Sequence, residues 1–422
     1  MNALHVLLAA QQLAFAPYHA NGTYAVRERI GWNVTVPPGQ SATGTYTYTV
    51  KRDGLAVIGS GTLSLASGRA TIETSLDQPG MVLVEVRPPA GTTGFHGASK
   101  SEVGRVLLGA AVAPREIRQS GARPRDFDAF WAAQLRRLDS VAVEPELTPH
   151  ESGRDSVDYF TIKMNNVGGA HVYGQLAKPR TSGRFPALLI LQWANPPYPL
   201  QREWVTNYAA QGWLVLNVEP HDVPSDMPQA FYDALPTLIK NYRLIGRHNR
   251  EESYFLPMYL GDYRAAEYLA SRPDWDGKTL VVMGTSMGGQ QSFAVAGLDP
   301  RVSALITNVP AACDMLGPLH GRAAPYPNWD VEHQDVGETA GYFDAVNFAP
   351  RIRARALVAM GFIDETSPPA GIWAAFNLLA GPKEVVPLVD APHNHMSTPE
   401  EVRPWAERST AWLADLASQA VK

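Results

Sequence analysis

The sequence predicts an α/β protein in which a mostly parallel β-sheet, covered by helices on both faces, follows a smaller β-sandwich. Two observations predict this arrangement. The hydrophobic pattern has period two near the N-terminus, whereas short apolar runs alternate with helical patterns over the rest of the chain. The length of 422 residues is enough for two or three domains of ordinary size.

Strands are predicted from about residue 25 to residue 86, where apolar and polar residues alternate. Tyr46, Tyr48 and Val50, for example, alternate with threonines, and Asp53-Gly54 has the composition of a hairpin turn. No helical stretch intervenes. Several short strands with such turns indicate an immunoglobulin-like β-sandwich over residues 17–113.

After a linker at residues 114–124, the pattern of residues 125–422 changes to that of a covered, mostly parallel sheet. A helix opens at Asp126, with apolar residues on one face from Phe127 to Leu138. Continuous apolar runs predict strands buried on both faces; they lie at 187–191, 213–218, 280–283, 304–306 and 356–360. Further helices are predicted at 260–270, 369–380 and 401–417.

Composition excludes several kinds of partner and site. The net charge is 36 − 41 = −5 without a basic cluster, which argues against nucleic acid as a partner. A single cysteine, Cys313, forbids an internal disulfide and any cysteine-based metal site. No apolar run reaches the roughly 20 residues that span a bilayer. The pair His221-Asp222 lacks a third ligand, so we expect neither a metal nor a cofactor.

Residues 1–16 have features of a signal peptide. A short apolar stretch precedes Ala14-Phe15-Ala16, which fits the small-x-small pattern of a cleavage site, although a basic start is missing. This favours a secreted or periplasmic protein. The alternative is a cytoplasmic protein whose first residues form an edge strand.

The most informative stretch is Gly-x-Ser-x-Gly between a predicted strand and a predicted helix. Residues 280–283 form the strand, and Gly284, Ser286 and Gly288 follow it. A sharp turn there exposes a serine oxygen above the sheet, and the helix N-terminus stabilises a developing negative charge. We therefore expect Ser286 to be a nucleophile. The alternative is a tight turn whose serine only caps the helix.

Downstream of Ser286, an acid and a base follow in the chain order that such a serine requires. Asp364 comes just after the apolar strand at 356–360 and is the favoured acid, with Glu365 as the weaker candidate. Two histidines, His393 and His395, share the loop after the last strand. Spacing alone does not choose between them, and we favour His395.

The oxyanion that forms during acyl transfer needs two backbone amide donors. Met287, directly after the serine, is expected to supply one. The second is expected from the loop after the strand at 187–191, at Trp193 or Ala194. In the same loop, Asn195 and Tyr198 are candidates for substrate binding, although an aromatic side chain there fits a buried scaffold as well.

These motifs resemble the acetylxylan esterase and cephalosporin-C deacetylase family of α/β-hydrolases, carbohydrate esterase family 7. Residues 284–289 are similar to its Gly-x-Ser-Gln-Gly-Gly signature, with Met287 in place of glutamine, and residues 124–131, 342–349 and 361–369 are similar to further family segments. The resemblance covers about 70% of the chain, excludes the β-sandwich, and implies an α/β-hydrolase fold. It also implies Ser286, Asp364 and His395 as the catalytic residues.

The resemblance and the ordered residues predict a serine carboxylesterase that removes acetyl or other small acyl groups from carbohydrate. The substrate is thus a small-molecule or oligosaccharide ester; the natural ester and the oligomeric state are left open. Glu219-Pro220-His221-Asp222 replaces the family's Arg-Gly-Gln, which weakens any transfer of substrate preference. The alternatives are a longer-chain esterase or peptidase of the same fold, or a glycan-binding protein without catalysis.

Overall fold

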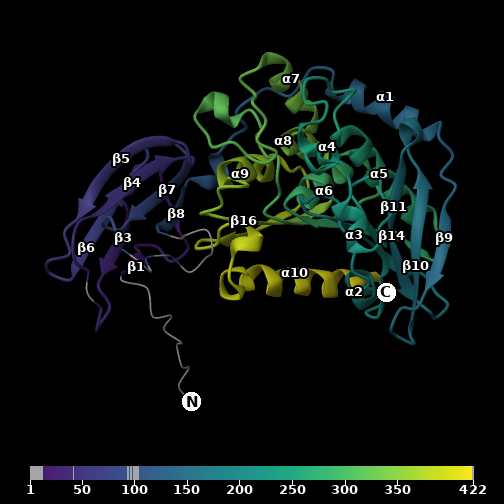
Figure 1. Cartoon of the computed structure of the whole chain (residues 1–422), viewed down its shortest axis with the longest axis horizontal. Helices are drawn as coiled ribbons and strands as arrows, with labels where there is room; N and C mark the ends of the chain where they lie inside the picture. The colour runs from purple at the N-terminus through teal and green to yellow at the C-terminus, as the bar shows by residue number, and fades with distance from the viewer. Residues whose placement is uncertain (1–12, 41, 93–94, 96, 98–103, 421–422) are drawn as a thin grey trace.

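The computed structural model describes residues 13–40, 42–92, 95, 97 and 104–420. Two small sheets built from the N-terminal residues lie beside a larger body of sheet and helices (Figure 1). Among the described residues, no helix combines the length and the apolar character needed to cross a membrane.

The N-terminal strands form two sheets. The three-stranded sheet has the order β1 (Ala14–Pro17), β3 (Ile30–Thr35) and β6 (Arg69–Thr74). The five-stranded sheet has the order β2 (Thr23–Tyr24), β8 (Val106–Val112), β7 (Gly80–Arg87), β4 (Tyr46–Arg52) and β5 (Ala56–Leu63). As expected, a turn at Asp53 and Gly54, both with positive φ, joins β4 to β5.

The two sheets enclose a common apolar core. Trp32 and Ile72 of the three-stranded sheet share it with Val50 and Val84 of the five-stranded sheet. Because successive side chains of a strand point to opposite faces, β7 and β8 direct their other residues away from this core. Met81 and its neighbours therefore reach the larger body, which explains why β7 and β8 are buried along nearly their whole length.

The strand β1 bears on the predicted signal peptide. Leu13 is fully buried in the N-terminal core, and Ala14–Pro17 pairs with β3. A cut after Ala16 would remove Leu13 and most of β1 from the sheet, so this strand argues against that cut position. Residues 1–12 of the predicted peptide lie outside the described residues.

The larger body contains a nine-stranded sheet in which six neighbouring strands are parallel. Its order is β17 (Lys383–Leu388), β16 (Arg355–Gly361), β15 (Ala304–Asn308), β14 (Trp275–Thr285), β12 (Phe185–Leu191), β13 (Leu214–Val218), β11 (His171–Pro179), β10 (Val157–Asn165) and β9 (Glu146–His150). The strands from β17 to β13 are parallel, and β11, β10 and β9 extend the sheet in antiparallel pairing.

Helices cover both faces of this sheet. One face packs against α2 (Glu203–Ala209) and α10 (Pro399–Ala420), and the other against α5 (Phe255–Ser271), α6 (Met287–Leu298) and α9 (Pro369–Leu378). Figure 1 shows α10 running along one side of the sheet, opposite α6. The remaining α-helices are α1 (Phe127–Asp139), α3 (Gln229–Asp233), α4 (Thr237–Lys240), α7 (Gln334–Phe343) and α8 (Ala345–Phe348).

The strands of this body explain the apolar runs in the sequence. Leu188 and Val281 face α2 and α10, whereas the next residues along each strand, Leu189 and Val282, face α5 and α6. Because both faces are covered, these strands are apolar throughout. The carboxyl ends of β12, β14, β16 and β17 meet at one edge of the sheet, which gathers the loops that carry the predicted site residues.

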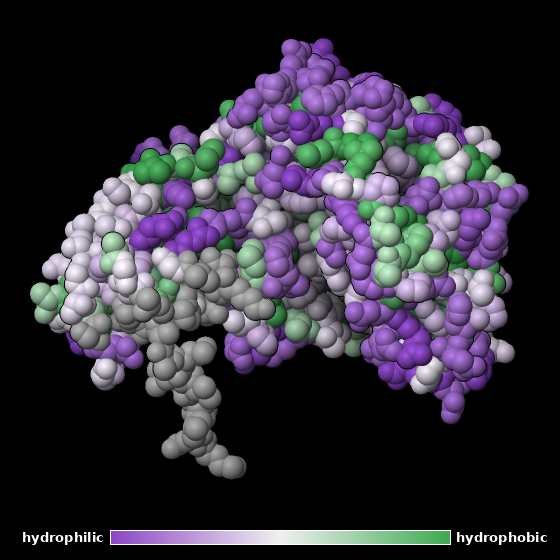
Figure 2. Space-filling model, viewed as in Figure 1, coloured by the Kyte–Doolittle hydropathy of each residue, from purple (hydrophilic) through white to green (hydrophobic). Residues whose placement is uncertain are grey.

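The outer edge of the five-stranded sheet leaves apolar side chains uncovered. Leu55, at its hairpin, and Val57 and Ile58 of β5 are exposed by 50%, 63% and 43%. Hydrophobic surface is visible in Figure 2 at the upper rim of this N-terminal part, where Figure 1 places β5. This edge lies on the side of the sheet away from β8.

Candidate active site

Ser286 lies on a strained turn between β14 and α6. Its φ of 58° and ψ of −120° are unusual for a residue with a side chain, and it caps the N-terminus of α6. A Cβ atom at Gly284 would lie 2.3 Å from the backbone of Gly288, and one at Gly288 would lie 2.1 Å from the carbonyl oxygen of Leu191. The glycines of the Gly-x-Ser-x-Gly motif are therefore required by close backbone approaches.

A chain of hydrogen bonds joins Ser286, His393 and Asp364. Nε2 of His393 lies 2.9 Å from Oγ of Ser286, and Nδ1 lies 2.8 Å from Oδ2 of Asp364. The three residues are 3–5% exposed. Since the carboxylate accepts a hydrogen bond from the N–H group at Nδ1, Nε2 of the neutral ring is left to accept the hydrogen bond of the serine hydroxyl.

The loop after β16 fixes the Asp364 carboxylate. Its other oxygen, Oδ1, accepts hydrogen bonds of 2.8 Å from the backbone amides of Thr366 and Ser367. With one oxygen held by two amides and the other by His393, the carboxylate has one orientation. The weaker candidate acid, Glu365, points elsewhere and pairs with Arg105 next to the five-stranded sheet.

The choice of His395 over His393 requires correction. His395 is exposed and contacts His393 edge to face, with 5.4 Å between the ring centroids. A short 3-10 helix, Asn394–Met396, begins directly after His393 and turns the following side chains out of the Ser286–Asp364 line. The hydrogen bond from Nδ2 of Asn308 to Oδ1 of Asn394, 2.8 Å long, holds this turn in place.

Two of the three predicted oxyanion residues line a cavity of about 650 Å³ above the serine. Trp193 and Ala194, which follow β12, line this cavity together with Ser286 and His393. Within the described part of the chain, the backbone amides of Trp193, Ala194 and Met287 donate no hydrogen bond. The amides of these three residues, close to the turn that carries Ser286, are thus available to a substrate oxygen.

Asn195 and Tyr198, the two candidates for substrate binding, differ in whether they line the cavity above the serine. Asn195 is exposed and lines the cavity above the serine. Tyr198 instead donates a hydrogen bond of 2.9 Å to Oε1 of Gln192, and its ring stacks on Trp193. Burial raises the pKa of Tyr198 well above its usual range, so its hydroxyl stays protonated and supports the loop.

His221 holds the loop that carries Asn195, a role that was not predicted. Its Nε2 lies 3.0 Å from the backbone oxygen of Asn195, and its Nδ1 lies 3.0 Å from the hydroxyl of Tyr254. Burial lowers the pKa of His221 to about 4, so the ring is neutral at pH 7. Nε2 therefore donates to the carbonyl oxygen, and Nδ1 accepts from Tyr254. With both nitrogens used, His221 is not available as a metal ligand.

Two tyrosines from distant segments meet Met287 below the cavity. The hydroxyls of Tyr242 and Tyr326 lie 2.8 Å apart, and that of Tyr242 lies 3.2 Å from the sulfur of Met287. Tyr326 also lines the cavity. No local pattern indicates that Tyr242 and Tyr326 meet, because their two segments come together only in the fold.

A model of the acetyl xylan esterase family matches residues 115–409. The chain belongs to the acetyl xylan esterase family. The acetyl esterase Axe7A of Xylanibacter ruminicola is 30% identical to this family member over 394 residues, which cover 91% of this chain and 87% of the relative. Since so much of the chain is matched, the similarity includes most of the N-terminal sheets.

Solved structures of this family share the fold. The acetyl xylan esterase of a Paenibacillus species has a TM-score of 0.61 and 23% identity, and covers 72% of this chain and 98% of its own. Acetyl xylan esterase 1 of a Thermoanaerobacterium species has a TM-score of 0.60 and 22% identity, and covers 72% and 97%. Both are similar to this chain as α/β-hydrolases. The family member described here is a serine esterase, and its relatives support an acetyl esterase role.

Proposed function

We propose that this esterase removes acetyl and similar small acyl groups from carbohydrate by a Ser286–His393–Asp364 triad. The hydrogen-bonded line from Ser286 through His393 to Asp364, at the floor of an open cavity, is the observation that carries the proposal. The similarity to the acetyl esterase Axe7A supports acetyl as the acyl group, and the family name, acetyl xylan esterase, supports a carbohydrate as the alcohol part of the ester.

In the first half of the reaction, Nε2 of His393 takes the proton of the Ser286 hydroxyl as Oγ attacks the ester carbonyl carbon. The carbonyl oxygen becomes an oxyanion, which accepts hydrogen bonds from the amide of Met287 and from that of Trp193 or Ala194. When the tetrahedral intermediate collapses, His393 returns the proton to the sugar oxygen. The sugar leaves with a free hydroxyl, and the acyl group stays on Ser286.

In the second half, water replaces the sugar. His393 takes a proton from the water as its oxygen attacks the acyl carbon, and the same amides hold the new oxyanion. Collapse breaks the bond to Oγ, His393 returns the proton to Ser286, and a carboxylic acid leaves. Asp364 keeps the imidazole in the required tautomer and stabilises its charged form in both halves.

The test is a substrate panel measured with the native chain and with Ser286→Ala. The panel contains acetylated xylan, acetylated small sugars and nitrophenyl esters of increasing acyl length. We expect the native chain to prefer acetyl esters, and Ser286→Ala to lose about a thousandfold or more in kcat.

Three results would contradict the proposal. Unchanged ester hydrolysis by Ser286→Ala would show that Ser286 is not the nucleophile. A preference for long acyl chains or for peptides would make the chain a hydrolase of another specificity. Binding of glycan without hydrolysis by the native chain would indicate a non-catalytic protein.

We further propose that the enzyme acts outside the cytoplasm, because an apolar stretch opens the sequence. Since Leu13 and β1 are part of the N-terminal core, a leader has to end before Leu13 for that core to stay complete. Mass spectrometry of the mature N-terminus tests this, and a mature chain beginning at Pro17 would contradict it.

A further inference from the structure

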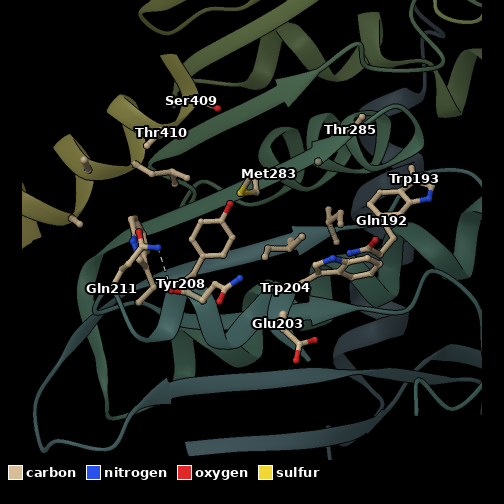
Figure 3. A pocket seen from close by; sticks show the side chains of 18 residues that line it. Gln192, Trp193, Glu203, Trp204, Tyr208, Gln211, Met283, Thr285, Ser409 and Thr410 are labelled. Atoms are coloured by element: carbon tan, nitrogen blue, oxygen red, sulfur yellow. Dashed lines mark hydrogen bonds between the residues drawn. The ribbon is translucent and has the colours of Figure 1, made fainter. Parts of the chain in front are cut away.

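An elongated cleft of about 670 Å³ lies between α2 and α10, beside the catalytic cavity. Its floor is the face of the central sheet, with Ile190 of β12 and Met283 of β14, and Leu413 closes one side. Figure 3 shows Gln211 and Tyr208 toward one end of this cleft, and Trp193 and Thr285 toward the other.

The cleft joins the site already described. Trp193 and Thr285 line both the cleft and the cavity that contains Ser286 and His393. Thr285 is the residue directly before the nucleophile, so a molecule that fills the cleft at this end lies next to the reacting ester. A binding site in this position would receive the part of a substrate that extends beyond its acetylated unit.

Two indole rings line the end of the cleft that is nearest to the serine. Trp193 is 40% exposed, which is unusual for such a large apolar side chain, and it meets Trp204 edge to face with 5.2 Å between centroids. Tyr198 supports the Trp193 ring by stacking on it. Exposed rings that are held firmly offer flat apolar surface at little entropic cost, and one face of a pyranose ring presents such a surface in its C–H groups.

The polar groups of the cleft are mostly uncharged. The Tyr208 hydroxyl extends over the sheet toward Met283 in Figure 3 and has no hydrogen-bond partner among the described residues. Gln211 and Thr410 line the same space. The Gln211 amide nitrogen donates to the Asn207 carbonyl oxygen at 3.2 Å and the Thr410 hydroxyl donates to the Ala406 carbonyl oxygen at 2.7 Å, so each side chain offers a ligand an oxygen that can accept a hydrogen bond. The one carboxylate, that of Glu203, pairs with Arg202 at 2.7 Å and points away from the labelled side chains around the cleft (Figure 3).

We propose that this cleft binds the neutral sugar units that adjoin the acetylated sugar of an oligosaccharide substrate. Aromatic surface next to amide and hydroxyl groups matches the two kinds of surface that a neutral sugar presents, and a charged ligand would find no opposite charge facing it. The proposal rests on the proposed function, since it names the part of the substrate that the triad does not touch. An alternative occupant is a long acyl chain on the apolar floor.

The experiment fills the cleft from α10, which carries none of the residues that line the catalytic cavity. Ala414 of α10 is exposed and lines the cleft, so Ala414→Trp places a bulky ring in it. Ala411 is exposed on the same helix but does not line the cleft, and Ala411→Trp is the matched control. Gln211→Ala, at the far end, removes one hydrogen-bonding side chain without adding bulk.

Each variant is assayed on nitrophenyl acetate and on acetylated xylo-oligosaccharides from xylobiose to xylopentaose. We expect the native kcat/KM to rise with chain length. Ala414→Trp should lower kcat/KM on the longer oligosaccharides by about tenfold, and Gln211→Ala by a few-fold. Both should leave nitrophenyl acetate within about twofold of the native value, and Ala411→Trp should behave as the native chain does.

The possible failures are distinguishable. If the native chain does not hydrolyse nitrophenyl acetate, the proposed function itself fails. If it does, but kcat/KM is independent of sugar length, or the Ala414→Trp loss is equal on both substrates, the sugar site is overturned. A selective loss on nitrophenyl octanoate, with oligosaccharides unaffected, would make the cleft an acyl site instead.

Binding of unacetylated xylotetraose to Ser286→Ala provides a second measurement, independent of turnover. Because Trp193 and Trp204 line the cleft, we expect the sugar to change tryptophan fluorescence in a saturable way, with at least tenfold weaker binding after Ala414→Trp is added. Equal affinity with and without Ala414→Trp would contradict the proposal.

Discussion

At the scale of single residues, the choice between His393 and His395 decides which histidine completes the proposed triad. His393→Gln should lower kcat by about a thousandfold or more, because the variant has no base within reach of Ser286. His395→Gln is the matched control, since the His395 ring lies outside the line from Ser286 to Asp364 and meets His393 edge to face, and we expect a change of less than about tenfold. Steady-state kinetics on an acetyl ester measure both, and a larger loss from His395→Gln would reverse the assignment.

The sequence placed both candidate histidines in the loop after the last strand but could not decide between them. Both histidines follow the last parallel strand, and the two positions differ only in which side of the next turn they occupy. That turn depends on the hydrogen bond between Asn308 and Asn394, which are far apart in the sequence. Ser286 and Asp364 each directly follow an apolar strand, so the sequence could place them at one edge of the sheet, whereas the histidine that meets them depends on a tertiary contact.

The buried, neutral ring of His221 leads us to predict how the stability of the fold depends on pH. Its pKa is about 4 in the folded chain and near 6.5 when unfolded, so the stability it contributes is complete above pH 6.5. That stability is lost as the pH falls toward 4, because the unfolded chain then gains a proton that the folded chain does not. His221→Gln should therefore destabilise the fold most near pH 7, and the difference should shrink by up to about 3 kcal/mol at pH 4.

Urea unfolding of the native chain and of His221→Gln from pH 4 to pH 8 measures this difference. A gap between the two free energies of unfolding that is constant, or that widens toward low pH, would contradict a neutral, buried His221. The same variant also frees the carbonyl of Asn195, so a fall in kcat at pH 7 is expected beside the loss of stability.

At the scale of elements, the tight turn from β14 to α6 leads us to predict that a side chain at Gly288 destabilises the fold. Gly288→Ala brings a Cβ to 2.1 Å from the carbonyl oxygen of Leu191, which is backbone at the centre of the sheet and has little freedom to move. We expect a loss of about 3 kcal/mol or more in stability, together with loss of activity. Gly59→Ala is the control, since its Cβ would meet Val50 at an ordinary 3.9 Å. Thermal unfolding and an ester assay test the pair.

The elements themselves were predictable to different extents. The strands from β12 to β16 stood out as apolar runs, because helices cover both of their faces. Strand β8 is just as apolar but was not recognised, since a strand buried on both faces was not expected inside a two-layer sandwich. The antiparallel strands β9, β10 and β11 were also missed; β9 is exposed throughout, and β10 mixes buried and half-buried positions without a clear period.

At the scale of the whole molecule, the five-stranded sheet packs against the loop that carries Asp364. A Cβ added at Gly109 of β8 would lie 2.6 Å from Cβ of Phe362, and Ile363 shares a small apolar cluster with Leu83 and Leu107. At the edge of this contact, Arg105 pairs with Glu365, the residue after the acid. No local sequence pattern indicates this contact, because its two sides lie far apart in the sequence.

We therefore expect the N-terminal sheets to position the acid loop. Gly109→Leu would push Phe362 outward and shift Asp364, two residues later, away from Nδ1 of His393. Because a misplaced acid costs turnover more than substrate binding, kcat should fall by about a hundredfold with KM nearly unchanged. Thr62→Leu, at an exposed position of β5 in the same sheet, is the control for a bulky side chain and should keep native kcat. Far-UV circular dichroism checks that both variants fold, and native kcat in a folded Gly109→Leu would show that Asp364 is held without the N-terminal sheets.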